Sequence, residues 1–196
     1  MVELLAVLAA SAAGGMRIAL PLLLIGLLQG DRLWSRVPLL SQLSPPIVLG
    51  VLVSWSLFEL FASKKLLGQR VLQLVQLVFS PLAGAVMGMA IAESTGRTSQ
   101  IVVILGIIGG LFALVLQLVQ VGWFFRLGGL PLWAIFTQDA LCIFLVLFAF
   151  DAPTQGGTIA LMLLWLAIRS SKAWYFYYQQ RQRSPSIAPL PPRQDL

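Results

Sequence analysis

Residues 4–28 read LLAVLAASAAGGMRIALPLLLIGLL, an apolar stretch long enough to cross a membrane that contains one charged residue, Arg17. A cation in the middle of a bilayer-length segment costs at least about 2.5 kcal/mol on insertion scales. It persists where groups inside the protein compensate for its charge. The stretch therefore predicts a membrane protein with a polar interior, although it does not identify a substrate.

The rest of the chain has the same character. Of its 196 residues, 59% are hydrophobic and 10% are charged, whereas about 25% of the residues in a typical soluble domain are charged. The apolar runs lack the alternation of polar and apolar residues that a membrane barrel requires. We therefore expect an all-α, polytopic transmembrane bundle of about six spans in the lipid bilayer. The six segments are 3–29, 46–62, 71–92, 101–125, 132–150 and 158–178.

Lys and Arg are distributed unevenly between the two ends of these segments. Loops 30–45, 93–100 and 151–157 hold three of them, whereas loops 63–70 and 126–131 together with the C-terminal end hold nine. The positive-inside rule makes the second group cytoplasmic, and an even number of crossings then places both termini in the cytoplasm. A re-entrant first segment would change this parity.

The expected organisation is a transmembrane domain over residues 1–178 and a disordered cytoplasmic tail over residues 179–196, which are rich in Gln, Arg, Ser and Pro. The first segment is expected to be retained, because Glu3 and no basic residue precede Arg17, whereas signal peptides begin with positive charge. The expected location is a bacterial inner or internal membrane, with a multi-pass topology.

Two short sequence echoes raise the possibility of internal repetition. Val-Leu-Gln-Leu-Val-Gln occurs at residues 71–76 and again at 115–120, and Gly14-Gly15 has a counterpart in Gly109-Gly110. Two inverted halves of three helices would explain such echoes. Their offsets differ, so coincidence in a chain rich in Leu, Val and Gly is the competing interpretation.

The glutamines of the repeated hexapeptide have a geometric consequence in either case. Residues three apart share a helix face, and the two segments run in opposite directions. Gln73, Gln76, Gln117 and Gln120 therefore fall at similar depth in the cytoplasmic half. We expect them to hydrogen-bond across an antiparallel hairpin, each contact contributing about 0.6–2 kcal/mol. Lining a wet cavity is the alternative role.

Besides Glu3, Arg169 and Lys172, three charged residues lie within the predicted spans: Arg17 near mid-depth, Glu59 near the inner end of the second segment, and Asp139 about 10 Å from the inner end of the fifth. An unpaired charge in hydrocarbon is far costlier than a paired one. We therefore predict that Arg17 pairs with Asp139 or Glu59. Glu59 has a second interpretation as a solvated helix end close to Lys64.

Helix-breaking residues flank this cluster. Gly14, Gly15 and Pro21 weaken helix continuity around Arg17, and Ser80-Pro81 predicts a kink in which the serine hydroxyl satisfies freed backbone groups. A broken helix beside a charge is how several transporters expose backbone dipoles to a substrate. A kinked helix with a structural ion pair is the alternative interpretation.

Several short motifs in order resemble a bacterial membrane family known as domain of unknown function 4126, over most of residues 8–150. They are Gly15-Met16-Arg17-Ile18-Ala19-Leu20-Pro21, Ser44-Pro45, Glu59, Pro81-Leu82-Ala83-Gly84-Ala85 and Gln138-Asp139. The family often carries a histidine in the fourth segment, where this chain has Gln117 or Gln120. The resemblance implies an integral membrane protein and supplies no substrate.

Other classes of function find no support in the residues. The sequence contains no histidine, no nucleotide-binding loop and no paired-carboxylate metal motif, and its one cysteine, Cys142, lies in an apolar run. Nor does it present a concentrated basic face for nucleic acid. We therefore expect no catalytic residue, cofactor or metal. The two leading hypotheses are a small transporter or channel, as a homo-oligomer or with a membrane-protein partner, and a non-catalytic scaffold of a larger membrane complex. An intramembrane enzyme ranks third.

Overall fold

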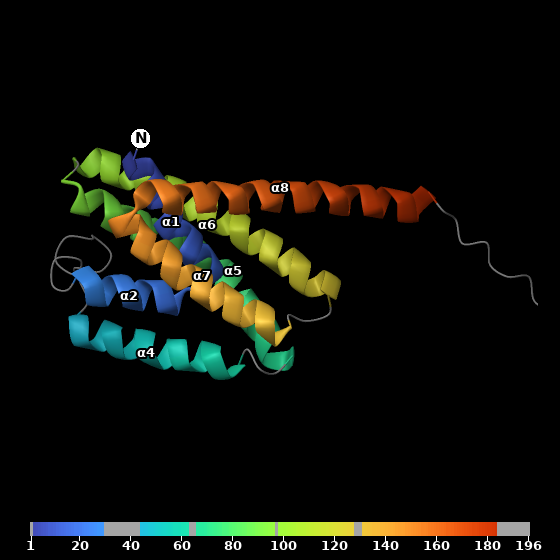
Figure 1. Cartoon of the computed structure of the whole chain (residues 1–196). Helices are drawn as coiled ribbons and strands as arrows, with labels where there is room; N and C mark the ends of the chain where they lie inside the picture. The colour runs from blue at the N-terminus through green and yellow to red at the C-terminus, as the bar shows by residue number, and fades with distance from the viewer. Residues whose placement is uncertain (1, 30–43, 63–65, 97, 128–130, 184–196) are drawn as a thin grey trace, which may run out of the picture.

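The computed structural model describes residues 2–29, 44–62, 66–96, 98–127 and 131–183, which form seven α-helices (Figure 1). The helices are α1 (Val2–Met16), α2 (Ala19–Gln29), α4 (Pro45–Ala62), α5 (Leu66–Ser94), α6 (Ser99–Leu127), α7 (Leu132–Asp151) and α8 (Pro153–Arg183). Within this part of the chain, α5, α6 and α7 are long and apolar enough to cross a membrane, while α1, α2 and α4 are apolar but shorter. The fold is that of an all-helical membrane protein.

The first expected segment, 3–29, is two helices and not one. The chain breaks at Arg17-Ile18, and α2 turns back toward the end of the bundle at which α1 begins (Figure 1). Pro21 explains the position of the break, because its ring clashes with the carbonyl of the residue four positions earlier, which is Arg17. The Arg17 amide makes the last bond of α1, to the Ala13 carbonyl at 2.9 Å.

The break lies around Arg17, as expected, but Gly14 and Gly15 do not form it. Both glycines are helical, and their role is close packing. A Cβ at Gly15 would lie 2.8 Å from the Ala113 carbonyl oxygen of α6, and one at Gly14 would lie 2.9 Å from the Met87 sulfur of α5. Small residues thus allow α1 to enter the middle of the bundle, where it packs against α5, α6, α7 and α8.

α5 and α6 form the central antiparallel hairpin. Gly96 closes it in the left-handed conformation, with φ of 70° and an amide bond of 3.0 Å to the Glu93 carbonyl. Along the interface, a Cβ at Gly84 would lie 2.7 Å from the Gly109 carbonyl oxygen. The Gly84-to-Gly88 spacing on α5 therefore serves helix packing, as its pattern predicts.

Ser80 and Pro81 differ in part from the expectation. α5 continues as one helix through Pro81. The Ser80 hydroxyl donates to the Ala113 carbonyl of α6 at 3.2 Å, so it joins two helices instead of repairing its own. This contact became possible because the facing residues of α6, Gly109, Gly110 and Ala113, are small.

The ends of the helices define two ends of the bundle (Figure 1). One end holds the start of α1, the end of α2, the α5–α6 turn and the α7–α8 turn; the opposite end holds the start of α5, the end of α6, the start of α7 and the end of α8. α8 remains helical to Arg183, past the boundary expected at residue 178. Residues 184–196 of the expected tail lie outside the described part of the chain.

A buried polar cluster at the helix break

Arg17 lies at the tip of the α1–α2 turn and pairs with Asp139 of α7. Its Nε is 2.6 Å from Asp139 Oδ1, and the two side chains are 7% and 20% exposed. Asp139 is one of the two partners expected from the sequence. The break at Arg17-Ile18 places the guanidinium where α7 passes, so the broken helix and the ion pair form one structural unit.

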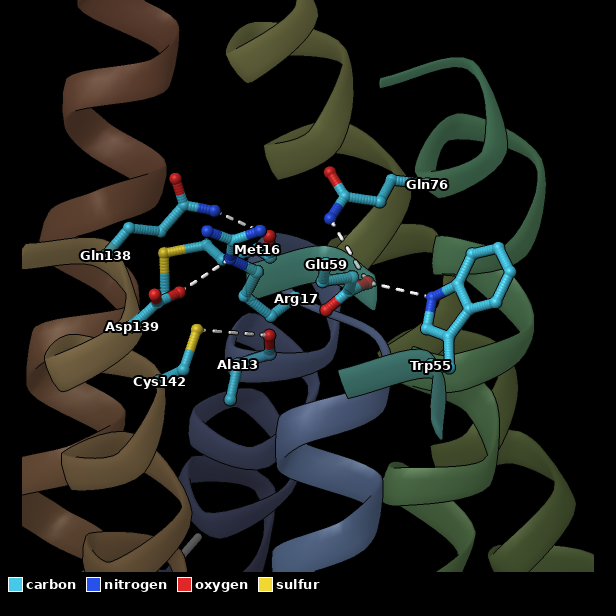
Figure 2. Close-up of polar contacts among 9 residues, drawn as sticks. All are labelled: Ala13, Met16, Arg17, Trp55, Glu59, Gln76, Gln138, Asp139 and Cys142. Atoms are coloured by element: carbon cyan, nitrogen blue, oxygen red, sulfur yellow. Dashed lines mark hydrogen bonds and ion pairs between the residues drawn. The ribbon is translucent and has the colours of Figure 1, made fainter. Parts of the chain in front are cut away.

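α7 also satisfies the open end of α1. The last carbonyls of a helix have no partner within it and require one from elsewhere. Gln138 Nε2 donates to the Met16 carbonyl at 2.6 Å, and the Cys142 thiol is a second donor, at 3.6 Å, to the Ala13 carbonyl that the Arg17 amide also contacts (Figure 2). Residues 138, 139 and 142 share one face of α7 by helical spacing. Cys142 is buried there, as expected of a small core residue.

Glu59 of α4 contributes a second carboxylate. It is 3% exposed, and its Oε1 accepts from Trp55 Nε1 at 3.0 Å and from Gln76 Nε2 at 3.4 Å. The interpretation as a solvated helix end is therefore wrong. In the view of Figure 2, Arg17 lies between Asp139 and Glu59. The cluster thus brings one basic and two acidic side chains into the interior.

The glutamines divide between two tasks. Gln117 Nε2 of α6 donates to Gln73 Oε1 of α5 at 3.1 Å, so these two do bond across the hairpin, as expected. Gln76 turns to Glu59 instead of crossing to α6. Among the described residues, the buried Oε1 atoms of Gln117 and Gln120 have no hydrogen-bond partner. These two acceptors are open to a water or another donor.

A small cavity of about 20 Å³ opens beside Arg17. This is room for about one water molecule. Its walls come from the α1–α2 turn, α5 and α7: Arg17, Gln69, Leu72, Gln73, Gln76, Ile135 and Gln138. Five of these seven carry a guanidinium or an amide, so the cavity can hydrogen-bond a water or a small ion. Within the described residues, no three His, Cys, Asp or Glu side chains are grouped as metal ligands would be.

Three members of the cluster were not expected from the sequence: Gln69, Trp55 and Gln138. Gln69 carried a signal, because it lies four residues before Gln73 and seven before Gln76, on the same helix face. Gln138 stood out only as the neighbour of Asp139. Trp55 carried none, since a tryptophan in an apolar run is ordinary.

The sequence pattern of the family described as Domain of unknown function (DUF4126) matches residues 4–173. The chain belongs to this family. The match spans α1 to α7 and most of α8, and so includes every residue of the polar cluster. Searches of curated proteins and of solved structures found no match. Membership of this family therefore carries no assigned activity.

Proposed function

We propose that this protein is a small transporter or channel whose polar path passes the buried cluster at Arg17. The observation that carries the proposal is the break at Arg17-Ile18, which ends two helices beside a buried charge instead of continuing one helix through the bundle. A discontinuous helix of this kind brings a C-terminal and an N-terminal helix end to one point. Transporters use such helix ends to bind ions and polar solutes.

The depth of the break supports this role. Ser11 donates to the Gly84 carbonyl at 3.1 Å, and Gly15 lies against Ala113, so α1 ends about halfway along α5 and α6. α1 and α2 therefore occupy one half of the bundle. The other half, toward the start of α5, contains the Gln-lined cavity and Glu59. This arrangement suits a polar vestibule in the half of the bundle that holds the cavity, which α1 and α2 close toward the other half.

The orientation follows from the basic residues. Arg70 lies near the start of α5, Arg126 near the end of α6, and Arg169 and Lys172 in the second half of α8. We therefore place the end of the bundle that holds the cavity, and the end of α8, in the cytoplasm. With α1 and α2 as a re-entrant pair, the N-terminus then lies on the opposite side. This replaces the expectation that both termini are cytoplasmic, which needed the first segment to cross in full.

The size of the cavity limits the solute. At about 20 Å³ it accepts a water or a small inorganic ion in this conformation and excludes organic metabolites. Arg17 and the side-chain amides of the lining glutamines supply donors, and the amide oxygens of the same glutamines supply acceptors. The proposed substrate class is therefore a small ion or water.

Water accessibility tests the proposal. In a Cys142→Ala background, Gln73→Cys and Gln138→Cys would be treated with a membrane-impermeant thiol reagent from each side. Both cysteines should react from the cytoplasmic side. Leu74→Cys is the matched control, because Leu74 follows Gln73 on α5 but is 65% exposed on the outer, lipid-facing surface and should stay unreactive. Arg70→Cys, exposed at the start of α5, reports that the reagent reaches this side. Reaction at Arg70→Cys without reaction at positions 73 and 138 would contradict a wet path.

A scaffold is the second candidate, and two observations support it. The cavity is small, and Arg17 already has its counter-ion. Holding α1, α5 and α7 together is therefore a sufficient role for the cluster. A dry cluster in the labelling experiment, combined with stoichiometric co-purification of a larger membrane complex, would favour this role. We expect an oligomer or a membrane-protein partner in either case, which native mass spectrometry of the purified protein measures.

A further inference from the structure

We infer that a groove between α6 and α8 binds an anionic phospholipid. The groove has a volume of about 290 Å³ and lies near the end of α6, from Leu118 to Arg126. Leu118, Val119 and Val121 form its apolar wall, while Arg126, Ser170 and Ser171 form its polar rim. A lipid combines these two chemistries in one molecule, an acyl chain for the wall and a phosphate for the rim.

Gly122 keeps the groove between α6 and α8 open. A glycine inside a helix costs about 1 kcal/mol relative to alanine unless close packing requires it. At each of the other glycines within α6, at positions 106, 109 and 110, an added Cβ would lie within 3 Å of an atom of another helix. A Cβ at Gly122 would meet nothing within 4 Å. Gly122 is therefore not needed for packing between helices, and its missing side chain leaves open space in the wall of the groove.

The positive charge at the groove favours a lipid with a negatively charged headgroup. Arg126 lines the rim, whereas Arg169 and Lys172 are exposed at the same level of α8 but do not line the groove; neither α6 nor α8 contains an Asp or Glu. Arg169 lies 5.1 Å from the centre of the Trp165 ring, a cation–π contact that keeps its charge at this level. A basic site between helices at the cytoplasmic interface is suited to an anionic lipid phosphate.

The depth of the rim also fits a headgroup. At about 1.5 Å per residue, Ser170 lies roughly 26 Å along α8 from its start, close to the thickness of about 30 Å of the hydrocarbon core. Trp123 is half exposed, and its Nε1 donates to Ser170 Oγ at 2.5 Å across the groove. Tryptophan at this position is typical of the membrane interface. The apolar wall at Leu118 then lies deeper, at acyl-chain level.

Native mass spectrometry of the full chain, with palmitoyl-oleoyl phosphatidylglycerol or phosphatidylcholine added, tests the inference. Phosphatidylglycerol should bind with higher affinity, by about fivefold for each basic residue that contacts the phosphate. Gly122→Leu, which fills the groove without a clash, should abolish this preference. Gly50→Leu on α4 is the matched control, since a Cβ there also meets nothing within 4 Å, and it should bind as the wild type does.

The charge variant Arg126→Gln should reduce binding of phosphatidylglycerol to the level of phosphatidylcholine, and it decides the question should Gly122→Leu fail to fold. Equal binding of the two lipids to the wild type would overturn the inference. So would undiminished phosphatidylglycerol binding to both variants. A dimer that is lost in Gly122→Leu while lipid binding persists would assign the groove to a second copy of the chain instead.

Discussion

At the scale of single residues, the sequence is most informative where it is most unusual. Arg17, Glu59 and Asp139 stand out because charged groups in apolar segments need partners, and two of them do pair at 2.6 Å. The choice between Asp139 and Glu59 could not be made from the sequence, because it depends on which helix passes the tip of α1. The roles of Gln69 and Trp55 were not predicted for a related reason, because these roles arise from contacts between helices.

Removing the partner of Arg17 should destabilise the protein. Asp139→Asn leaves a guanidinium that is 7% exposed without its counter-ion, and we expect a loss of about 3 kcal/mol in the free energy of unfolding. The double variant Arg17→Gln/Asp139→Asn should recover most of this loss. Unfolding in mixed detergent micelles measures it, with Asp151→Asn, an exposed acid at the end of the same helix, as the control. A double variant no more stable than Asp139→Asn would show that the ion pair is not the cause.

Glu59 should respond differently to loss of its charge. Glu59→Gln keeps the oxygen that accepts from Trp55 and Gln76, so we expect a change below about 1 kcal/mol. Glu59→Leu removes this acceptor and leaves the half-buried donor of Trp55 and the buried donor of Gln76 unpaired, at a cost of about 1–3 kcal/mol. The same micelle unfolding experiment compares the two variants. An equal effect of Gln and Leu would mean that the hydrogen bonds to Glu59 do not stabilise the fold.

At the scale of helices, five of the six segments were predictable from apolar run length, and the first was not. Gly14-Gly15 and Pro21 all suggested a break near Arg17, but only the structure shows which of them acts. Pro21 sets the break through its clash with the Arg17 carbonyl, while the glycines bring α1 against α5 and α6. Sequence rules predict that glycine weakens a helix; they do not show that a neighbouring helix occupies the space of its missing side chain.

Packing between these helices should depend on glycine at the interface and not elsewhere. A Cβ at Gly109 would lie 2.7 Å from the Gly84 carbonyl oxygen, so Gly109→Ala should destabilise the protein by about 1–3 kcal/mol. Gly50→Ala meets no atom within 4 Å and should stabilise the helix by up to about 1 kcal/mol. Thermal unfolding in detergent compares the two variants. A neutral Gly109→Ala would mean that α5 and α6 pack less closely than described.

At the scale of the whole molecule, composition alone indicated a helical membrane protein, whereas the path of the chain depended on one turn. A first segment that crosses in full and one that turns back at Arg17 have the same hydropathy and the same basic residues. They differ in the side of the membrane on which the N-terminus lies. They also differ in whether the first segment fills the whole length of the bundle or only the half that does not contain the polar cluster. The expected pair of inverted three-helix halves is affected as well, because α1 and α2 have no broken counterpart among α6, α7 and α8.

The sidedness of three single cysteines tests this account most directly. In a Cys142→Ala background, Val2→Cys, Thr95→Cys and Lys172→Cys, all at exposed positions, would be treated with an impermeant thiol reagent before and after cell lysis. We predict that positions 2 and 95 react together in intact cells and that position 172 reacts only after lysis. Reaction of positions 2 and 172 together, with position 95 apart, would show that the first segment crosses in full and would contradict the re-entrant turn at Arg17.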